Sequence, residues 1–98
     1  MRGNQYFVYI LASKRGGTLY IGMTSDLVKR VYQHKKDQAD GFAKKYQLHD
    51  PVYYETTNDV QAAIAGEKHL KTWQRAWKIR LIEERNPPWL DLYPEIIG

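Results

Sequence analysis

The sequence contains no cysteine. This absence excludes a disulfide framework, cysteine-ligated zinc, iron–sulfur clusters and thiol nucleophiles, and it suits the reducing conditions of a cytoplasmic protein. Long apolar runs are lacking as well, because the longest, at 7–12 and 62–65, are far too short to span a bilayer. The first of them is rich in β-forming residues, so we expect neither a signal peptide nor a membrane partner.

The length and composition indicate one globular domain, residues 1–98. Hydrophobic residues make up 43% of the chain and charged residues 27%, which argues against disorder. The net charge of +4 is uneven: residues 1–50 hold nine Lys or Arg against four Asp or Glu, whereas residues 83–98 hold four acidic residues against one Arg. Such a distribution favours a polyanionic partner, although a basic chain can also simply be soluble.

Hydrophobic periodicity predicts an α+β fold, with a three-stranded, mostly antiparallel sheet flanked by helices. We expect the long helical stretch to break near 72–76, because it is long for so small a domain. Pro87 and Pro88 should end the second of the two resulting helices, and the residues that follow should form an extended tail. The expected order is strands at 5–12 and 19–22, a helix capped at 24–26 and ending near 36, a short helical link at 40–47, a strand at 51–57 and helices within 59–85.

Two predicted helices carry polar residues on the face that should meet the core. In the first, Arg30 and His34 share an i, i+3, i+4, i+7 stripe with Leu27 and Val31. In the second, Glu67 interrupts an apolar stripe. An unpaired buried charge costs several kcal/mol, so each should have a partner or a function.

Several interpretations of these residues stay open. Arg30 and Glu67 can form a buried salt bridge, or their stems can be buried while their charged heads reach water. Alternatively, a carboxylate suited to Mg²⁺ and an arginine able to hold phosphate bidentately describe a phosphodiester site. Tyr9 and Tyr20, on the predicted strands, can be core residues or can join this site, but tyrosine is a poor base unless a nearby cation stabilises its phenolate.

Five segments of the chain resemble the GIY-YIG endonuclease superfamily, most closely its small single-domain, YhbQ-like bacterial branch. The segments are distributed from residue 7 to residue 92, so the resemblance covers nearly the whole chain. The first signature element departs from the family pattern, because it reads Phe7-Val8-Tyr9 in place of Gly-Ile-Tyr. The segments are FVYIL at 7–11, LYIGMTSDLVKRVYQH at 19–34, VYYE at 52–55, AIAGEKHLKTWQRAWKIRLI with Glu67, and NPPWLDL at 86–92.

The resemblance implies a metal-dependent endonuclease that hydrolyses phosphodiester bonds with one divalent ion, Mg²⁺ or Mn²⁺. Its substrate would be nucleic acid, DNA rather than RNA, in a DNA repair or processing role. The alternative is a non-catalytic DNA- or RNA-binding module on the same fold, which the altered first signature element and the lack of room for a separate targeting domain favour. We expect a monomer or weak dimer, with a protein partner as one source of specificity.

The resemblance also implies roles for individual residues. Glu67 would be the metal ligand and Arg30 the phosphate clamp. Tyr9 would accept the proton of the attacking water with help from His34, and Tyr20 would position the water or phosphate, although the tyrosine roles can be exchanged. The residues expected to support the site are Gly22 and Asn86. The basic residues expected to contact the nucleic-acid backbone are Lys14, Arg15, Lys29, Lys35, Lys36, Lys44, Lys45, Lys71, Arg75 and Lys78.

Overall fold

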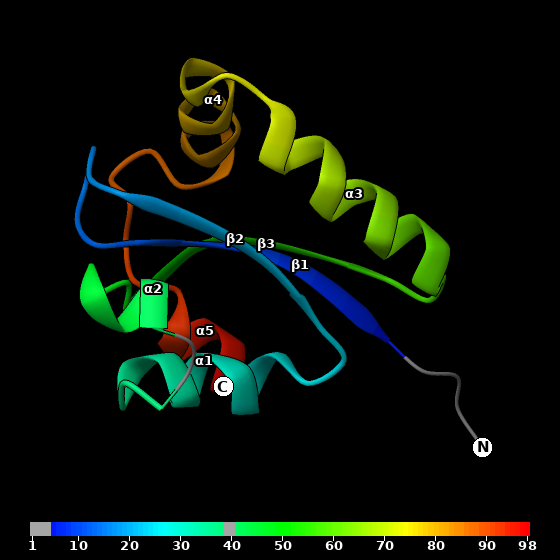
Figure 1. Ribbon diagram of the computed structural model, residues 1–98, viewed down its shortest axis with the longest axis horizontal. Helices are drawn as coiled ribbons and strands as arrows, with labels where there is room; N and C mark the ends of the chain where they lie inside the picture. Colours follow the sequence, from blue (N-terminus) through cyan, green and yellow to red (C-terminus); the bar gives the residue numbers. More distant parts are fainter. Residues whose placement is uncertain (1–4, 39–40) are drawn as a thin grey trace.

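The computed structural model describes residues 5–38 and 41–98. An antiparallel sheet with the strand order β2-β1-β3 lies between two helical layers (Figure 1). This confirms the predicted fold class. None of the described helices is long and apolar enough to cross a bilayer. The elements are β1 (Tyr6–Ala12), β2 (Leu19–Thr24), α1 (Leu27–Lys35), α2 (Gly41–Lys45), β3 (Asp50–Thr57), α3 (Val60–Thr72), α4 (Arg75–Arg85) and α5 (Tyr93–Ile97).

The central strand β1 organises the sheet. It pairs with β2 from Phe7–Thr24 to Ala12–Leu19 and with β3 on its other side, with a register shift between Ile10 and Leu11. The β1–β2 turn uses Gly16 at a φ of +71°, a conformation that glycine adopts without a steric penalty. The hairpin register places Tyr9 directly opposite Gly22, and Tyr20 opposite Leu11.

The two faces of the sheet support separate cores, because successive side chains of a strand point to opposite faces. In Figure 1, α3 and α4 lie above the sheet, whereas α1, α2 and α5 lie below it. The core on the α3–α4 side contains Val8, Ile10, Ala12, Ile21, Val52, Tyr53, Ala63, Leu70, Ile82 and Trp89. The core on the α1 side contains Tyr9, Leu11, Leu27, Val31, Ala43 and Leu48.

The long helical stretch breaks within the predicted interval, 72–76. Trp73 and Gln74 have extended backbone conformations, with ψ angles of 148° and 150°, and separate α3 from α4. The prediction of an extended tail is wrong in part, because the tail contains α5. Pro94 lies in the first turn of this helix, where its missing N–H has no intrahelical acceptor to lose. Just before the helix, the Asp91 carboxylate accepts a hydrogen bond from the Tyr93 N–H at 2.9 Å.

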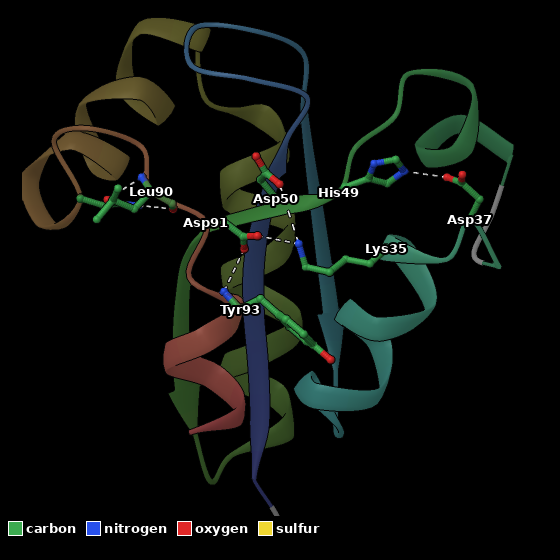
Figure 2. A network of polar contacts seen from close by, with 8 residues as sticks. Lys35, Asp37, His49, Asp50, Leu90, Asp91 and Tyr93 are labelled. Carbon is green, nitrogen blue, oxygen red and sulfur yellow. Dashed lines mark hydrogen bonds and ion pairs between the residues drawn. The ribbon is translucent and has the colours of Figure 1, made fainter.

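Lys35 joins the end of α1 to the tail and to the start of β3 (Figure 2). Its Nζ lies 2.6 Å from Asp91 Oδ2 and 3.8 Å from Asp50 Oδ1. Partial burial, together with the Asp91 charge, raises the pKa of Asp50, and Lys35 opposes this shift. Lys35 is one of the residues expected to contact nucleic acid. In the structure two carboxylates match its charge, and Lys35 holds the tail against α1.

Candidate active site

A tyrosine and a histidine meet beneath the sheet, on the side of α1. Tyr9 comes from the central strand and has no exposed surface, while His34 comes from the last turn of α1 and is 2% exposed. The Tyr9 hydroxyl and His34 Nε2 lie 3.3 Å apart and share a hydrogen bond. The spacing that aligned His34 with Leu27 and Val31 predicted its inward position, and the structure confirms it.

Gly22 makes room for the Tyr9 side chain. It is the β2 residue opposite Tyr9 in the hairpin register. A Cβ atom at this position would fall within 3.0 Å of Oη, Cζ and Cε1 of Tyr9, so the phenol ring lies directly across the glycine. Only a residue without a side chain allows this approach. The expected support from Gly22 is therefore a packing role.

Tyr20 is the signature tyrosine that reaches the surface. It lies on the same face of β2 as Gly22 and is half-buried. Its ring centroid lies 5.5 Å from that of His34 and 6.5 Å from that of Tyr9. A proton acceptor must come within hydrogen-bonding reach of its substrate, and the burial of Tyr9 prevents this in the observed conformation. The geometry thus favours the exchanged roles, with Tyr20 nearest to the reacting atoms.

The tyrosines of β3 are poorly suited to accept a proton. Burial raises the pKa of Tyr53. The hydroxyl of Tyr54 donates a hydrogen bond to Glu95 Oε2 at 2.6 Å, and this bond raises the pKa of Tyr54. Both phenols therefore keep their protons at neutral pH.

Arg30 lies one helical turn before His34 and is half-buried. No hydrogen bond or ion pair to any residue in 5–38 or 41–98 holds its guanidinium. The group borders a hollow of about 210 Å³ between the end of β2 and the first turns of α1. An arginine whose five donors have no protein partner can bind phosphate. The hollow is lined by Thr24, Ser25, Asp26, Lys29, Arg30 and Gln33.

Sequence reasoning assigned only Lys29 and Arg30 of this hollow to the site and missed its four other polar residues, among them Thr24 and Gln33. Thr24 has the same strand parity as Tyr20, and Gln33 follows Arg30 at i+3, so periodicity carried a signal for both. Thr24 Oγ1 accepts a hydrogen bond from the Asp26 N–H at 3.0 Å, and Asp26 in turn caps α1 through the Lys29 N–H. These bonds fix the entry to the helix and so the position of the hollow.

Glu67 lies in the other helical layer. It belongs to α3, which packs on the face of the sheet opposite Tyr9 and His34. Its Oε2 is 3.2 Å from Lys71 Nζ, so it pairs with its i+4 neighbour and not with Arg30. The structure therefore brings Tyr9, Tyr20 and His34 together but leaves Glu67 outside this cluster. The two layers share the edge strand β2, against which α3 packs.

A metal at Glu67 would depend on donors from outside the protein. Within the described ranges, no group of three or more His, Asp or Glu side chains is arranged to hold an ion. Mg²⁺ commonly binds one or two carboxylates and takes its remaining ligands from water and substrate phosphate. The Glu67 side chain is 24% exposed, which leaves its oxygens accessible. The residues present thus fit an ion whose coordination shell is completed by water and substrate phosphate, and they do not fit a site in which the protein supplies every ligand.

Asn86 holds a turn of the fold. Its buried side chain donates hydrogen bonds to the carbonyls of Val52, at 3.1 Å, and Leu90, at 2.9 Å. Its Oδ1 accepts from the Leu90 N–H at 2.9 Å. Both amide hydrogens are engaged, so Asn86 joins the end of α4 to β3 and to the tail.

The basic residues expected at a nucleic-acid interface fall into two groups. Three are engaged within the fold, because Lys35 and Lys71 form ion pairs and Arg75 Nη2 donates to the carbonyls of Gly16 and Gly17 at 2.7 and 2.6 Å. The remainder form none of the ion pairs found in the described residues and stay available for phosphate contacts. These are Lys14, Arg15, Lys29, Lys36, Lys44, Lys45 and Lys78, of which Lys78 is half-buried and the others are exposed.

Comparison with known proteins gives one family. The family model described as the GIY-YIG catalytic domain matches residues 5–80. A UPF0213 protein of Staphylococcus aureus (strain Mu3) is 34% identical over 82 residues, which cover 84% of this chain and 99% of the relative. A UPF0213 protein of Staphylococcus saprophyticus is 31% identical over 81 residues, with 83% and 98% covered. No solved structure gives a significant match.

Proposed function

The chain belongs to the GIY-YIG family of nuclease-type catalytic domains, and we propose that it is a metal-dependent endonuclease that cleaves DNA in repair or processing. The observation that carries the proposal is the buried Tyr9–His34 hydrogen bond behind Tyr20, one helical turn from the unpaired guanidinium of Arg30. The sequence predicted each of these four residues as part of a phosphodiester site, and they come from three different elements.

Arg30 would hold the scissile phosphate. Its guanidinium offers donors in a rigid fork that matches two phosphate oxygens. Negative charge develops on the phosphoryl group as the phosphorus is attacked, and a donor already in place stabilises that charge in the transition state without reorganisation. The nearby exposed Lys29 adds positive charge at the same hollow.

Tyr20, in a phenolate form that a nearby cation would stabilise, would accept the proton of the attacking water, because it is the signature tyrosine that reaches the surface. Tyr9 and His34 would act behind it as positioning residues. Their hydrogen bond and their ring contacts to Tyr20 restrict where the Tyr20 ring can lie. In this assignment, Gly22 contributes the space that Tyr9 needs to reach His34.

Glu67 would hold the divalent ion, Mg²⁺ or Mn²⁺, at the β2 edge. When bound, such an ion supplies positive charge to the phosphate oxygens and to the leaving oxygen. The Glu67 carboxylate must give up its Lys71 partner to bind it. That exchange is inexpensive, because a half-exposed i, i+4 ion pair stabilises a helix by only about 0.2–0.5 kcal/mol.

One observation favours the alternative, a non-catalytic DNA- or RNA-binding module. Glu67 belongs to the helix on the opposite face of the sheet from Tyr9 and His34, and its carboxylate pairs with Lys71. A binding module would use Arg30 and the exposed lysines but would have no need of the carboxylate.

Incubation of the purified protein with single-stranded, duplex and branched DNA, and with RNA, tests the proposal. We expect cleavage of at least one DNA substrate with Mg²⁺ or Mn²⁺, and none in EDTA. RNA cleavage alone would correct the substrate class. Binding to these nucleic acids without cleavage under any metal condition would contradict the nuclease and support the binding module.

A further inference from the structure

Two of the three tryptophans lie exposed at the junction of α3 and α4. Trp73 follows the end of α3 and is 39% exposed, while Trp77 lies in the first turn of α4 and is 57% exposed. Their ring centroids are 6.1 Å apart in an edge-to-face arrangement. The third, Trp89, is buried and donates a hydrogen bond to Glu83. The described fold therefore uses one tryptophan in its core and leaves the other two partly exposed to solvent.

The exposed pair borders a hollow of about 250 Å³ on the outer side of α4. This volume is below the range of about 300–1,000 Å³ that is usual for sites enclosing a small molecule. The hollow thus suits a flat group laid on the surface better than an enclosed ligand. Its lining residues are Trp73, Trp77, Arg80, Leu81 and Glu84.

The charge around the pair selects an anionic partner. Residues 68–82 contain five Lys or Arg and no Asp or Glu, and the two tryptophans lie in the middle of this segment. Two of the five, Lys71 and Arg75, are engaged within the fold, which leaves Lys68, Lys78 and Arg80 to interact with a ligand. Glu84 is a carboxylate at the edge of the hollow. It would repel a phosphate placed there but can accept a hydrogen bond from the exocyclic amine of a base. The arrangement fits a nucleotide whose base stacks on the indole rings and whose phosphate group points toward the surrounding cations.

The tryptophan pair is also fixed relative to the sheet. Arg75, between the two tryptophans in sequence, donates two hydrogen bonds from Nη2 to the carbonyls of the β1–β2 turn, at Gly16 and Gly17. This attachment holds the start of α4 against the hairpin that carries Tyr9 and Tyr20. A platform held in this way loses little conformational freedom when a ligand binds.

From these observations we infer that Trp73 and Trp77 form a base-stacking platform for unpaired nucleotides, and that the substrate of the proposed nuclease contains a single-stranded segment. Stacking on aromatic side chains needs a base whose face is open, which a duplex does not offer along its length. Trp73 lies six residues after Glu67, or about 9 Å along a helix axis. The platform would hold a base a few nucleotides from an ion at Glu67. This inference rests on the proposed function for its link to cleavage, but the platform itself binds without it.

Intrinsic tryptophan fluorescence in EDTA tests the platform without cleavage. The probes are single-stranded DNA, single-stranded RNA and blunt duplex DNA of about 12 nucleotides, a length within known single-strand site sizes. We expect single strands to quench the exposed tryptophans and the duplex to quench them far less. By fluorescence anisotropy of a labelled strand, Trp77→Ala should weaken single-strand binding about tenfold, whereas Trp77→Phe should retain most of the affinity because it keeps a π face.

The matched control is Tyr32→Ala, which removes an exposed aromatic residue of α1 (46% exposed) that lies beside Lys36. It should leave single-strand affinity unchanged, and circular dichroism should show that every variant is folded. Equal quenching by duplex and single strand, or unchanged affinity of folded Trp77→Ala, would overturn the platform. Self-association that Trp77→Ala abolishes, without any effect on single-strand binding, would instead identify the pair as a contact between copies. If the protein binds single strands through the tryptophans but cleaves no substrate, the proposed nuclease activity is contradicted and the platform is not.

Discussion

Replacing Arg30 with alanine should lower the rate of DNA cleavage at saturating protein by about 10²–10³-fold, the effect of removing a preorganised donor from a developing charge. The fold should hardly change, because the Arg30 guanidinium makes no hydrogen bond or ion pair to the residues of the described ranges. Single-turnover cleavage of a labelled strand measures the rate, and thermal unfolding followed by circular dichroism checks the fold.

Two further variants separate charge from geometry at the same hollow. Arg30→Lys keeps the charge but loses the planar fork, so it should recover little of the rate. Lys29→Ala removes an exposed cation from the same lining and should weaken binding at low salt while leaving the saturated rate close to wild type. Wild-type cleavage by Arg30→Ala would show that the hollow does not hold the scissile phosphate.

Gly22→Ala should be the most destabilising small substitution in the hairpin. The added methyl group would lie within 3.0 Å of three atoms of the Tyr9 phenol, and Tyr9 is fully buried with its hydroxyl bonded to His34. Such overpacking costs about 1–3 kcal/mol, and each kcal/mol lowers Tm by about 4–8 °C in a domain of this size. Displacement of Tyr9 should also reduce cleavage, because the ring behind Tyr20 moves.

Gly66→Ala is the matched control, since it adds the same methyl group in the middle of α3. Its nearest neighbour would be Val8 Cγ2 at 3.6 Å, an ordinary contact. Alanine is favoured over glycine inside a helix by about 0.5–1 kcal/mol, so this variant should unfold at a higher temperature than wild type. A Gly22→Ala protein as stable as Gly66→Ala would contradict the close packing of Tyr9 over the glycine.

Helical spacing was enough to predict that His34 is buried, because Leu27 and Val31 fixed which side of α1 meets the core. Arg30, on the same stripe, is only half-buried and borders an open hollow. The same reasoning placed Glu67 on the side of its helix that faces the sheet. It could not predict which face of the sheet α3 covers, since the periodicity of a helix carries no information about the layer in which it packs. For this reason the interpretation of Arg30 and Glu67 as a buried salt bridge is wrong: the two residues lie on opposite faces of the sheet, and Glu67 pairs with Lys71.

Other features depended on contacts that no local pattern reveals. The Tyr9 ring crosses Gly22 only because the hairpin register sets the two residues opposite each other. The tail forms α5 next to the Asp91 carboxylate that also binds Lys35, a pairing across most of the chain. The resemblance assigned Asn86 to the support of the site, and the sequence did not reveal that its side chain also bonds to Val52 and Leu90.

The role of Glu67 is tested most directly by the cleavage rate as a function of Mg²⁺ concentration, in the wild type and in Glu67→Gln. Glutamine keeps the size of the side chain but removes the charge that binds the ion. Glu55→Gln, which alters an exposed carboxylate on β3, controls for the lost charge. We expect Glu67→Gln to lose Mg²⁺-dependent cleavage while Glu55→Gln retains it. Wild-type cleavage with an unchanged Mg²⁺ dependence in Glu67→Gln would show that the α3 carboxylate does not serve the site beside Tyr20.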